Sequence, residues 1–198
     1  IATGVAGNDI LCAADFSSNV QVVCAGDSVS FTDHSYNGIT SRDWTFPGAS
    51  PAAATDAEVT VAYPTPGVYN VTLTAGNGLN TVSSTQPGYI LVLPATGAAM
   101  PYSQDFEAVS TLNSSEWFVW NPDAAETFSL NTTTGYSGNH SIRLRNDLND
   151  DGDKDELIST TYDLSGATEI NLTFRYAVAR NNADNDDILR APVRKDRG

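Results

Sequence analysis

The chain has 198 residues and a formal net charge of −14, with 10 Lys and Arg against 24 Asp and Glu. This acidic balance disfavours binding to nucleic acid phosphates or to an anionic membrane surface, and it makes cations the expected small partners. Charged residues are only 17% of the chain, while Gly, Ser, Thr and Asn are abundant. That composition is typical of extracellular β-proteins, so we expect a protein that is secreted or displayed at a cell surface.

No run of about 18 consecutive apolar residues is present, so the sequence predicts no membrane insertion. The chain begins at Ile1 without a methionine, and residues 1–11 are small and irregular. We expect these residues to be a linker from a preceding segment of a longer polypeptide, with any signal peptide further upstream.

Residues 12–94 alternate between short stretches of strand character and turn residues, which predicts an antiparallel β-sandwich. Its expected strands cover residues 14–17, 20–23, 28–33, 41–46, 58–63, 68–75 and 89–93. In the stretch 68–75 the alternation places Tyr69, Val71, Leu73 and Ala75 on one apolar face. Turns are expected at Pro66-Gly67 and Asn77-Gly78. Trp44 is predicted to fill the core together with Phe16, Phe31, Phe46, Tyr69 and Leu73.

Residues 95–101 lack periodicity and lie between two prolines, so we expect a linker there. Strand character then resumes at residues 102–106, 117–120, 128–130, 141–144, 156–161, 169–177 and 187–193. No helix of three turns is predicted in either half. The sequence therefore predicts an all-β chain, with one β-sandwich followed by an antiparallel jelly roll over residues 102–198.

Cys12 and Cys24 are the only cysteines, too few for a structural zinc site. We predict a disulfide between them. Two unpaired buried thiols, or pairing of Cys12 with an upstream segment, are the alternatives.

An acidic run at residues 147–156 carries oxygen side chains with the spacing of a calcium loop. Asp147, Asn149 and Asp151 occupy positions 1, 3 and 5, and Gly152 occupies position 6, as in the first half of an EF-hand loop. Position 12 is Ile158, where a bidentate Glu is expected. Both a calcium site and a solvated acidic turn are consistent with this pattern.

Catalytic signatures are absent from the sequence. The two histidines, His34 and His140, fall in different predicted domains, and no His-Glu-x-x-His or Gly-x-Ser-x-Gly motif is present. A zinc protease site cannot be built from these residues, so we predict no zinc and no enzymatic activity of this chain itself.

Residues 43–48, reading Asp-Trp-Thr-Phe-Pro-Gly, and the turn-bounded strand within residues 63–78 resemble a PKD domain. PKD domains are immunoglobulin-like sandwiches usually appended to secreted enzymes or surface proteins. The more common motif of that family is Trp-Asp-Phe-Gly-Asp-Gly, and both of its acidic positions are replaced here. The resemblance implies an accessory module for this half of the chain.

Asp105-Phe106-Glu107, the phrase Gly-Asn-His-Ser-Ile-Arg-Leu at 138–144, and residues 172–177 and 187–190 carry a second resemblance. They resemble the galactose-binding-type or MAM-like jelly rolls of secreted bacterial adhesins and proteases. In such jelly rolls a calcium ion joins the first strand to a late one, which implies calcium ligation by Asp105, Glu107 and Asp187. The alternative is a set of surface carboxylates without a ligand.

The order of the two modules resembles the region after the catalytic domain in cytophagalysin-like (pappalysin-family) zinc metalloproteases. The last residues depart from the jelly-roll pattern, because Pro192 would remove a ladder donor and Arg197 stands at an expected Cys. We therefore expect the second domain to be C-terminally incomplete.

The expected function is a non-catalytic accessory region of a secreted bacterial metalloprotease that binds substrate or surfaces and spaces domains. Its expected partners are the upstream catalytic domain of the same polypeptide and an extracellular protein or polysaccharide. Trp117, Trp120 and Tyr136 are the candidate contacts, with core packing as the alternative. A purely structural module for folding or secretion, or part of an adhesin or hemagglutinin without a protease, are the rival functions.

Overall fold

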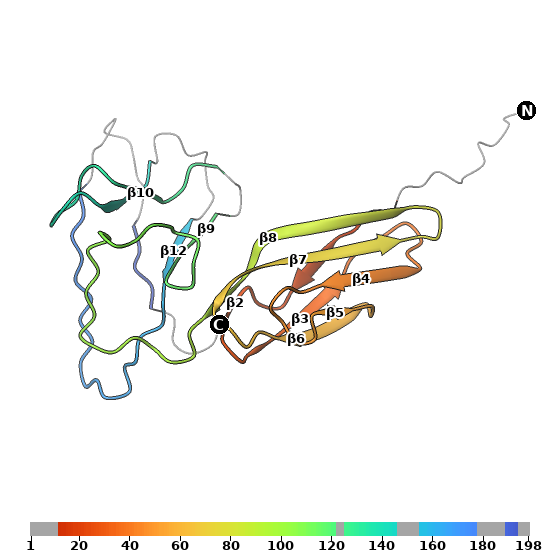
Figure 1. Ribbon diagram of the computed structural model, residues 1–198, viewed down its shortest axis with the longest axis horizontal. Helices are drawn as coiled ribbons and strands as arrows, with labels where there is room; N and C mark the ends of the chain where they lie inside the picture. Colours follow the sequence, from red (N-terminus) through yellow and green to blue (C-terminus); the bar gives the residue numbers. More distant parts are fainter. Residues whose placement is uncertain (1–11, 122–124, 146–154, 178–188, 194–198) are drawn as a thin grey trace, which may run out of the picture. The chain divides into compact units, whose positions relative to one another are not determined.

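The computed structural model describes residues 12–121, 125–145, 155–177 and 189–193 (Figure 1). The chain is all-β, and no helix occurs among the described residues. It divides between Ala95 and Thr96 into two compact units. This division falls within the predicted linker at residues 95–101.

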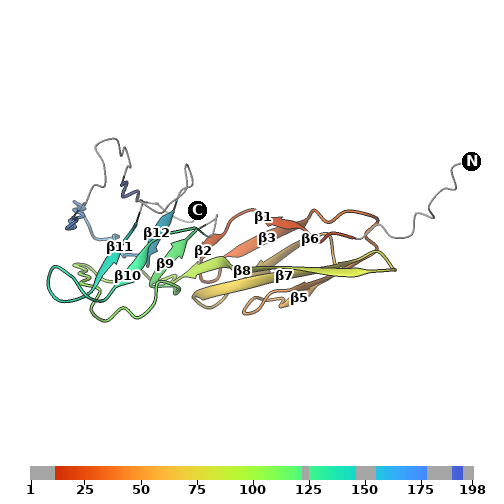
Figure 2. The same cartoon turned by 90° about the horizontal axis from the view of Figure 1, so that it is seen from above.

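The first unit is a sandwich of two sheets, which confirms the predicted immunoglobulin-like fold. Figure 2 shows its two layers. One sheet has the order β1-β3-β6, with β1 (Phe16–Ser18), β3 (Ser28–Asp33) and β6 (Glu58–Ala62). The other has the order β2-β8-β7-β4-β5, with β2 (Val22–Cys24), β8 (Thr81–Leu93), β7 (Gly67–Gly76), β4 (Ser41–Thr45) and β5 (Ala53–Ala54). Strand β2 runs parallel to β8, and the other pairs are antiparallel.

Strict alternation along the strands builds the core of this sandwich. Val29 and Phe31 of β3 are fully buried, and between them Ser30 pairs its hydroxyl with Thr60 on the outer side. The predicted inner face of β7 is confirmed, because Val71, Leu73 and Ala75 are buried while the residues between them are more exposed. The apolar period of two therefore decides which side of each strand faces the other sheet.

Trp44 stands at the centre of the core, as predicted. Its ring stacks on Phe46 with centroids 5.5 Å apart and meets the edge of Phe16 at 5.3 Å. Its indole N–H donates to the backbone carbonyl of Asp56 at 2.9 Å. The buried polar end of the ring is thereby satisfied, as a tryptophan in a core requires.

The β7–β8 hairpin is longer than the sequence predicts. Strand β8 begins at Thr81 instead of Tyr89, because the polar residues of its first half pair with β7 through the backbone and bury little. A register shift follows Tyr69, and there the side chain of Asn70 accepts a hydrogen bond from Gly88 N at 2.7 Å. The predicted turn at Asn77-Gly78 is confirmed, with the Asn77 side chain capping the loop.

The predicted disulfide between Cys12 and Cys24 is wrong for this structure. The Cys12 thiol is buried and lies 3.5 Å from the carbonyls of Ala75 and Asn80, at the β7–β8 turn. Cys24 pairs with Leu93, at the opposite end of the hairpin. A ten-residue strand such as β7 spans about 30 Å, far beyond the reach of a disulfide.

The second unit contains two small antiparallel sheets among its described residues. Strand β9 (Trp117–Trp120) pairs with β12 (Glu156–Ser159), and β10 (Ser129–Asn131) pairs with β11 (Ser141–Arg143). Strands were predicted in all four places. Among the described residues of this unit, Phe118 and Val109 are the buried apolar ones.

The predicted strands at residues 102–106 and 169–177 are wrong for the described part of the chain, since both segments lie outside the sheets found there. Residues 102–106 bend into a turn, and residues 169–177 are exposed without a pairing strand among the described residues. Alternating apolar residues favour an extended chain, but a ladder also needs a neighbouring strand. The jelly roll stays a prediction, because two separate sheets of two strands each do not define that fold.

Candidate functional site

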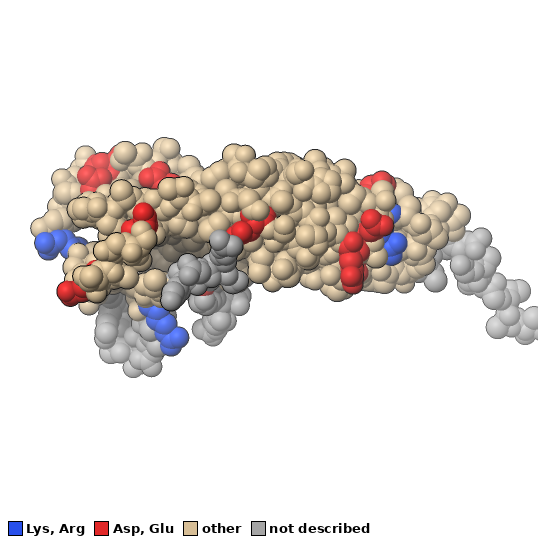
Figure 3. Space-filling model, turned by 90° about the horizontal axis from the view of Figure 1, so that it is seen from below, with Lys and Arg blue, Asp and Glu red and all other residues tan. Residues whose placement is uncertain are grey.

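Charged side chains are dispersed on the one face of the molecule that Figure 3 draws. On the face drawn in Figure 3, carboxylate side chains lie at several separate places and most of the surface carries neither charge. That face shows no concentrated patch of Lys and Arg of the kind that binds nucleic acid. Two clusters of polar groups, one in each unit, join segments that are separated in the sequence.

The cluster in the second unit begins with a tight turn at Phe106. This residue has a φ of 66°, in the left-handed region that non-glycine residues seldom adopt. Two side chains hold the turn: Gln104 Oε1 accepts from the Phe106 N–H at 2.7 Å, and Asp105 Oδ1 accepts from the Glu107 N–H at 3.0 Å. The Asp-Phe-Glu phrase is therefore a turn whose carboxylates lie at the surface.

Glu107 and His140 join this turn to the loop between β10 and β11. Glu107 Oε1 accepts from the His140 backbone N–H at 2.7 Å, and His140 Nδ1 lies 3.0 Å from the Phe106 carbonyl oxygen. Because a carbonyl oxygen only accepts, Nδ1 carries the proton of this contact. The same carbonyl accepts from the Val109 N–H at 3.1 Å. The turn and the loop thus form one hydrogen-bonded assembly.

Gly138 leaves the space that the Glu107 carboxylate occupies. A Cβ at this position would lie 2.5 Å from both Cδ and Oε1 of Glu107. The loop itself closes through a hydrogen bond from Gly135 N to the carbonyl of Gly138 at 3.1 Å. Any larger residue at position 138 would therefore have to displace the carboxylate.

The three aromatic residues predicted to contact a ligand differ in exposure. Trp117 is half-buried and packs on Phe106 with centroids 5.0 Å apart, so it supports the turn from β9. Trp120 is also half-buried. Tyr136 is 75% exposed, and the guanidinium carbon of Arg175 lies 4.0 Å from its ring centroid. Of the three, Tyr136 offers an open ring, held by a cation–π contact.

The predicted calcium ligands lie partly outside the described residues. Asp105 and Glu107 are brought into one turn, and each uses one carboxylate oxygen for a backbone N–H. Asp187 and the loop residues Asp147, Asn149 and Asp151 lie outside the described residues. Within the described ranges, no group of three or more His, Cys, Asp or Glu residues is placed to hold a metal ion.

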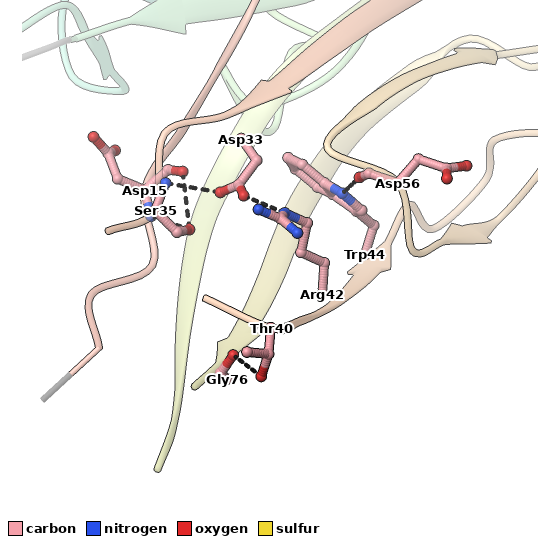
Figure 4. Close-up of polar contacts among 8 residues, drawn as sticks. All are labelled: Asp15, Asp33, Ser35, Thr40, Arg42, Trp44, Asp56 and Gly76. Atoms are coloured by element: carbon pink, nitrogen blue, oxygen red, sulfur yellow. Dashed lines mark hydrogen bonds and ion pairs between the residues drawn. The ribbon is translucent and has the colours of Figure 1, made fainter. Parts of the chain in front are cut away.

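The cluster in the first unit centres on the ion pair between Asp33 and Arg42 (Figure 4). It joins the end of β3 in one sheet to β4 in the other. The Asp33 side chain is 2% exposed, and its Oδ1 also accepts from the Ser35 N–H at 2.8 Å. Burial raises the pKa of Asp33, but hydrogen bonds from Ser35 and the charge of Arg42 outweigh it and lower that pKa below 3.8. The carboxylate is therefore ionised at neutral pH.

Hydrogen bonds also anchor the loop that follows Asp33. The Asp15 N–H donates to Ser35 Oγ at 3.1 Å, and His34 Nε2 lies 2.8 Å from Ser17 Oγ. These contacts hold the loop against β1 and against the residue that precedes it. They give the polar groups of this cluster a structural task, which the sequence did not reveal because the partners lie on separate strands.

Strands β1 to β7, the first part of β8 and these anchored loops fall within one stretch that matches a known family. Residues 13–87 match the PKD domain family. This confirms the resemblance for the first unit, and a PKD domain is a non-catalytic, immunoglobulin-like sandwich. No curated protein matches the chain.

The first unit has a structural reason for one of its departures from the common PKD motif. Gly48 stands at one of the acidic positions with a φ of +78°. A Cβ there would lie 2.2 Å from the Tyr69 ring. The Tyr69 side chain thus fills the space that a longer residue at position 48 would need.

PKD domains are commonly extracellular modules for adhesion or accessory roles. In the ranges that the structure covers, no helix has the length and apolar character to cross a membrane.

Proposed function

We propose that this chain is a non-catalytic extracellular accessory region of a secreted bacterial metalloprotease, placed after its catalytic domain. The PKD domain spaces the modules, and the second unit, with a jelly-roll fold, binds an extracellular protein or polysaccharide. The match of residues 13–87 to the PKD domain family carries the proposal. The polar clusters support it, because their carboxylates and histidines are engaged with backbone and structural partners rather than with one another as acid and base.

Tyr136 is the proposed contact with the polymer. An exposed tyrosine ring offers an apolar face and a polar tip, which suit stacking on a sugar ring or packing on an extended peptide. Arg175 lies over the ring and limits its movement before binding. A side chain that is already held loses less conformational entropy when a ligand arrives.

Calcium is the proposed ion of the second unit. Carboxylate oxygens are ligands that calcium prefers, and a carboxylate has about four acceptor sites, so Asp105 and Glu107 retain coordination capacity beyond their hydrogen bonds to backbone N–H groups. Asp187 and the loop at residues 147–151 are the proposed sources of further oxygens. The ion would hold the turn at Phe106 and add positive charge beside two carboxylates.

The test measures retention and hydrolysis on the same material. The chain is incubated with insoluble collagen, chitin and cellulose in calcium buffer, and the bound protein and the soluble products are both quantified. We expect retention on at least one polymer above that of an unrelated β-sandwich, without release of products. Release of products would contradict the non-catalytic assignment, and retention no greater than the control on every polymer would leave a structural role in folding or secretion.

A further inference from the structure

Residues 169–177 of the second unit form an extended run with two different sides. Phe174 and Tyr176 share one side, with ring centroids 6.1 Å apart. On the other side, the amide nitrogen of Asn171 donates to Glu169 Oε1 at 3.1 Å. Contacts between residues two apart arise when alternate side chains share a side, as in a β-strand. The segment, drawn in blue without an arrow in Figure 1, is thus extended although it pairs with no strand among the described residues.

The apolar side of this segment is open to solvent. Its four members are between 55% and 73% exposed: Ile170, Leu172, Phe174 and Tyr176. An extended chain with exposed apolar side chains and no pairing strand among the described residues is a template for pairing with another strand. The sequence of the segment indicates which strand fits it.

We propose that residues 169–177 pair antiparallel with the same residues of a second copy of this chain. In the register centred on Leu172, Glu169 of each copy faces Arg175 of the other. A two-fold axis through Leu172 makes every such pair occur twice. Opposite charges and apolar pairs placed directly across an antiparallel ladder stabilise it. The segment is therefore complementary to itself.

The same register also matches the apolar side. Ile170 of each copy faces Phe174 of the other, and the two Leu172 residues meet at the axis. A register centred on Thr173 would instead place Glu169 opposite Ala177 and lose the charge pairs. Charge complementarity thus selects both the partner and the register.

Arg175 is suited to this contact although it already lies over Tyr136. A guanidinium stacked on a ring keeps its N–H donors in its own plane, where a carboxylate can approach. Stacking also restricts the side chain before the second copy arrives. Against the dimer stands the net charge of −14 on each chain, which opposes association. One pair of strands is a small interface, so we expect a dimer in reversible equilibrium with the monomer.

The test is a concentration series by sedimentation velocity at fixed ionic strength, on the whole chain and three variants. Arg175→Glu places like charges opposite each other and should raise the dimer dissociation constant at least about tenfold. The exchange of both charges, Glu169→Arg with Arg175→Glu, restores the pairs and the net charge, and should restore the dimer. Arg143→Glu is the matched control, since it changes the net charge equally at an exposed position of β11.

The substituted side chains are exposed, so thermal melting should show that each variant remains folded. A wild-type chain that stays monomeric at all concentrations would overturn the proposal. A dimer that Arg175→Glu weakens no more than Arg143→Glu would show that another surface pairs. If the exchanged variant did not regain the dimer, the proposed register would be wrong.

Discussion

Glu107 Oε1 accepts a hydrogen bond from the backbone N–H of His140 at 2.7 Å, across 33 residues of sequence. The return contact runs from His140 Nδ1 to the carbonyl of Phe106. These two bonds connect the turn at residues 104–107 to the β10–β11 loop. In the proposed function the same carboxylate has a second task, as a ligand to calcium, and the two tasks can be separated by substitution.

Glu107→Gln and Glu107→Ala should differ when calcium is chelated. A glutamine keeps an oxygen that accepts from the His140 N–H, whereas alanine leaves that donor without it, so alanine should lower the free energy of unfolding by about 1 kcal/mol and glutamine by less. Added calcium should raise the melting temperature of the wild type by mass action. The rise should be smaller in both variants. Melting curves in EDTA and in calcium measure both effects.

Glu116→Gln is the control, because Glu116 is exposed and its side chain has no part in the cluster that joins the turn to the loop. Its melting temperature should respond to calcium as the wild type does. An equal calcium response in the wild type and in Glu107→Gln would contradict ligation by Glu107.

Gly138→Ala should displace the Glu107 carboxylate, because the new Cβ would lie 2.5 Å from it. The carboxylate is the end of a flexible side chain, so we expect a loss of about 1 kcal/mol and not a failure to fold. In a Glu107→Ala background the added cost should largely disappear, since the clashing atoms are gone. Urea unfolding of the two single variants and the double variant measures this coupling.

Gly166→Ala is the matched substitution, since a Cβ there meets nothing within 4 Å. It should leave the free energy of unfolding almost unchanged. Additive effects of Gly138→Ala and Glu107→Ala would show that the two positions do not touch.

Asp33→Asn should destabilise the first unit in a pH-dependent way. Removing one partner of this nearly buried pair should cost about 1–3 kcal/mol at pH 7. The pKa of Asp33 in the folded state lies below its ordinary value of 3.8. Its stabilising effect is therefore complete above that ordinary value and is lost as pH falls through the folded pKa. The deficit of the variant should shrink below about pH 4.

Urea unfolding of both proteins at pH 7 and at pH 3 measures the two deficits, and the difference between proteins removes the contribution of the other carboxylates. A deficit of equal size at both pH values would show that the ionised form of Asp33 is not the stabilising one.

The sandwich was predictable because its information is local. Period-two burial in β7, the turn at Asn77-Gly78 and the apolar positions around Trp44 are each set by neighbouring residues. The first half of β8 was missed because its residues are polar, and its position follows from backbone pairing with β7 alone. Local pattern thus identifies buried strands better than exposed ones.

The sites depended on contacts between distant residues, and these were less predictable. Nothing local shows that Asp33 meets Arg42, since the pair joins strands of different sheets. The Cys12–Cys24 disulfide failed for the same reason, because nearness in sequence hid their placement at opposite ends of a hairpin. The sequence indicated the Asp-Phe-Glu phrase as a candidate site, but it predicted a strand where the structure has a turn at Phe106. In the sequence, the glycine at position 138, next to Asn139 and His140, was the one feature that could have indicated a close contact of this loop.

The binding isotherm of the chain on an insoluble polymer that retains it, compared with that of Tyr136→Ala, tests the proposed function most directly. Tyr36→Ala is the matched control, since Tyr36 is 59% exposed and lies in the first unit. We predict saturable binding by the wild type and by Tyr36→Ala, and an affinity at least about tenfold lower for Tyr136→Ala, the loss expected for a central aromatic contact. Equal isotherms for all three proteins, or no saturable binding by the wild type, would contradict the assignment of Tyr136 and of the second unit as the binding module.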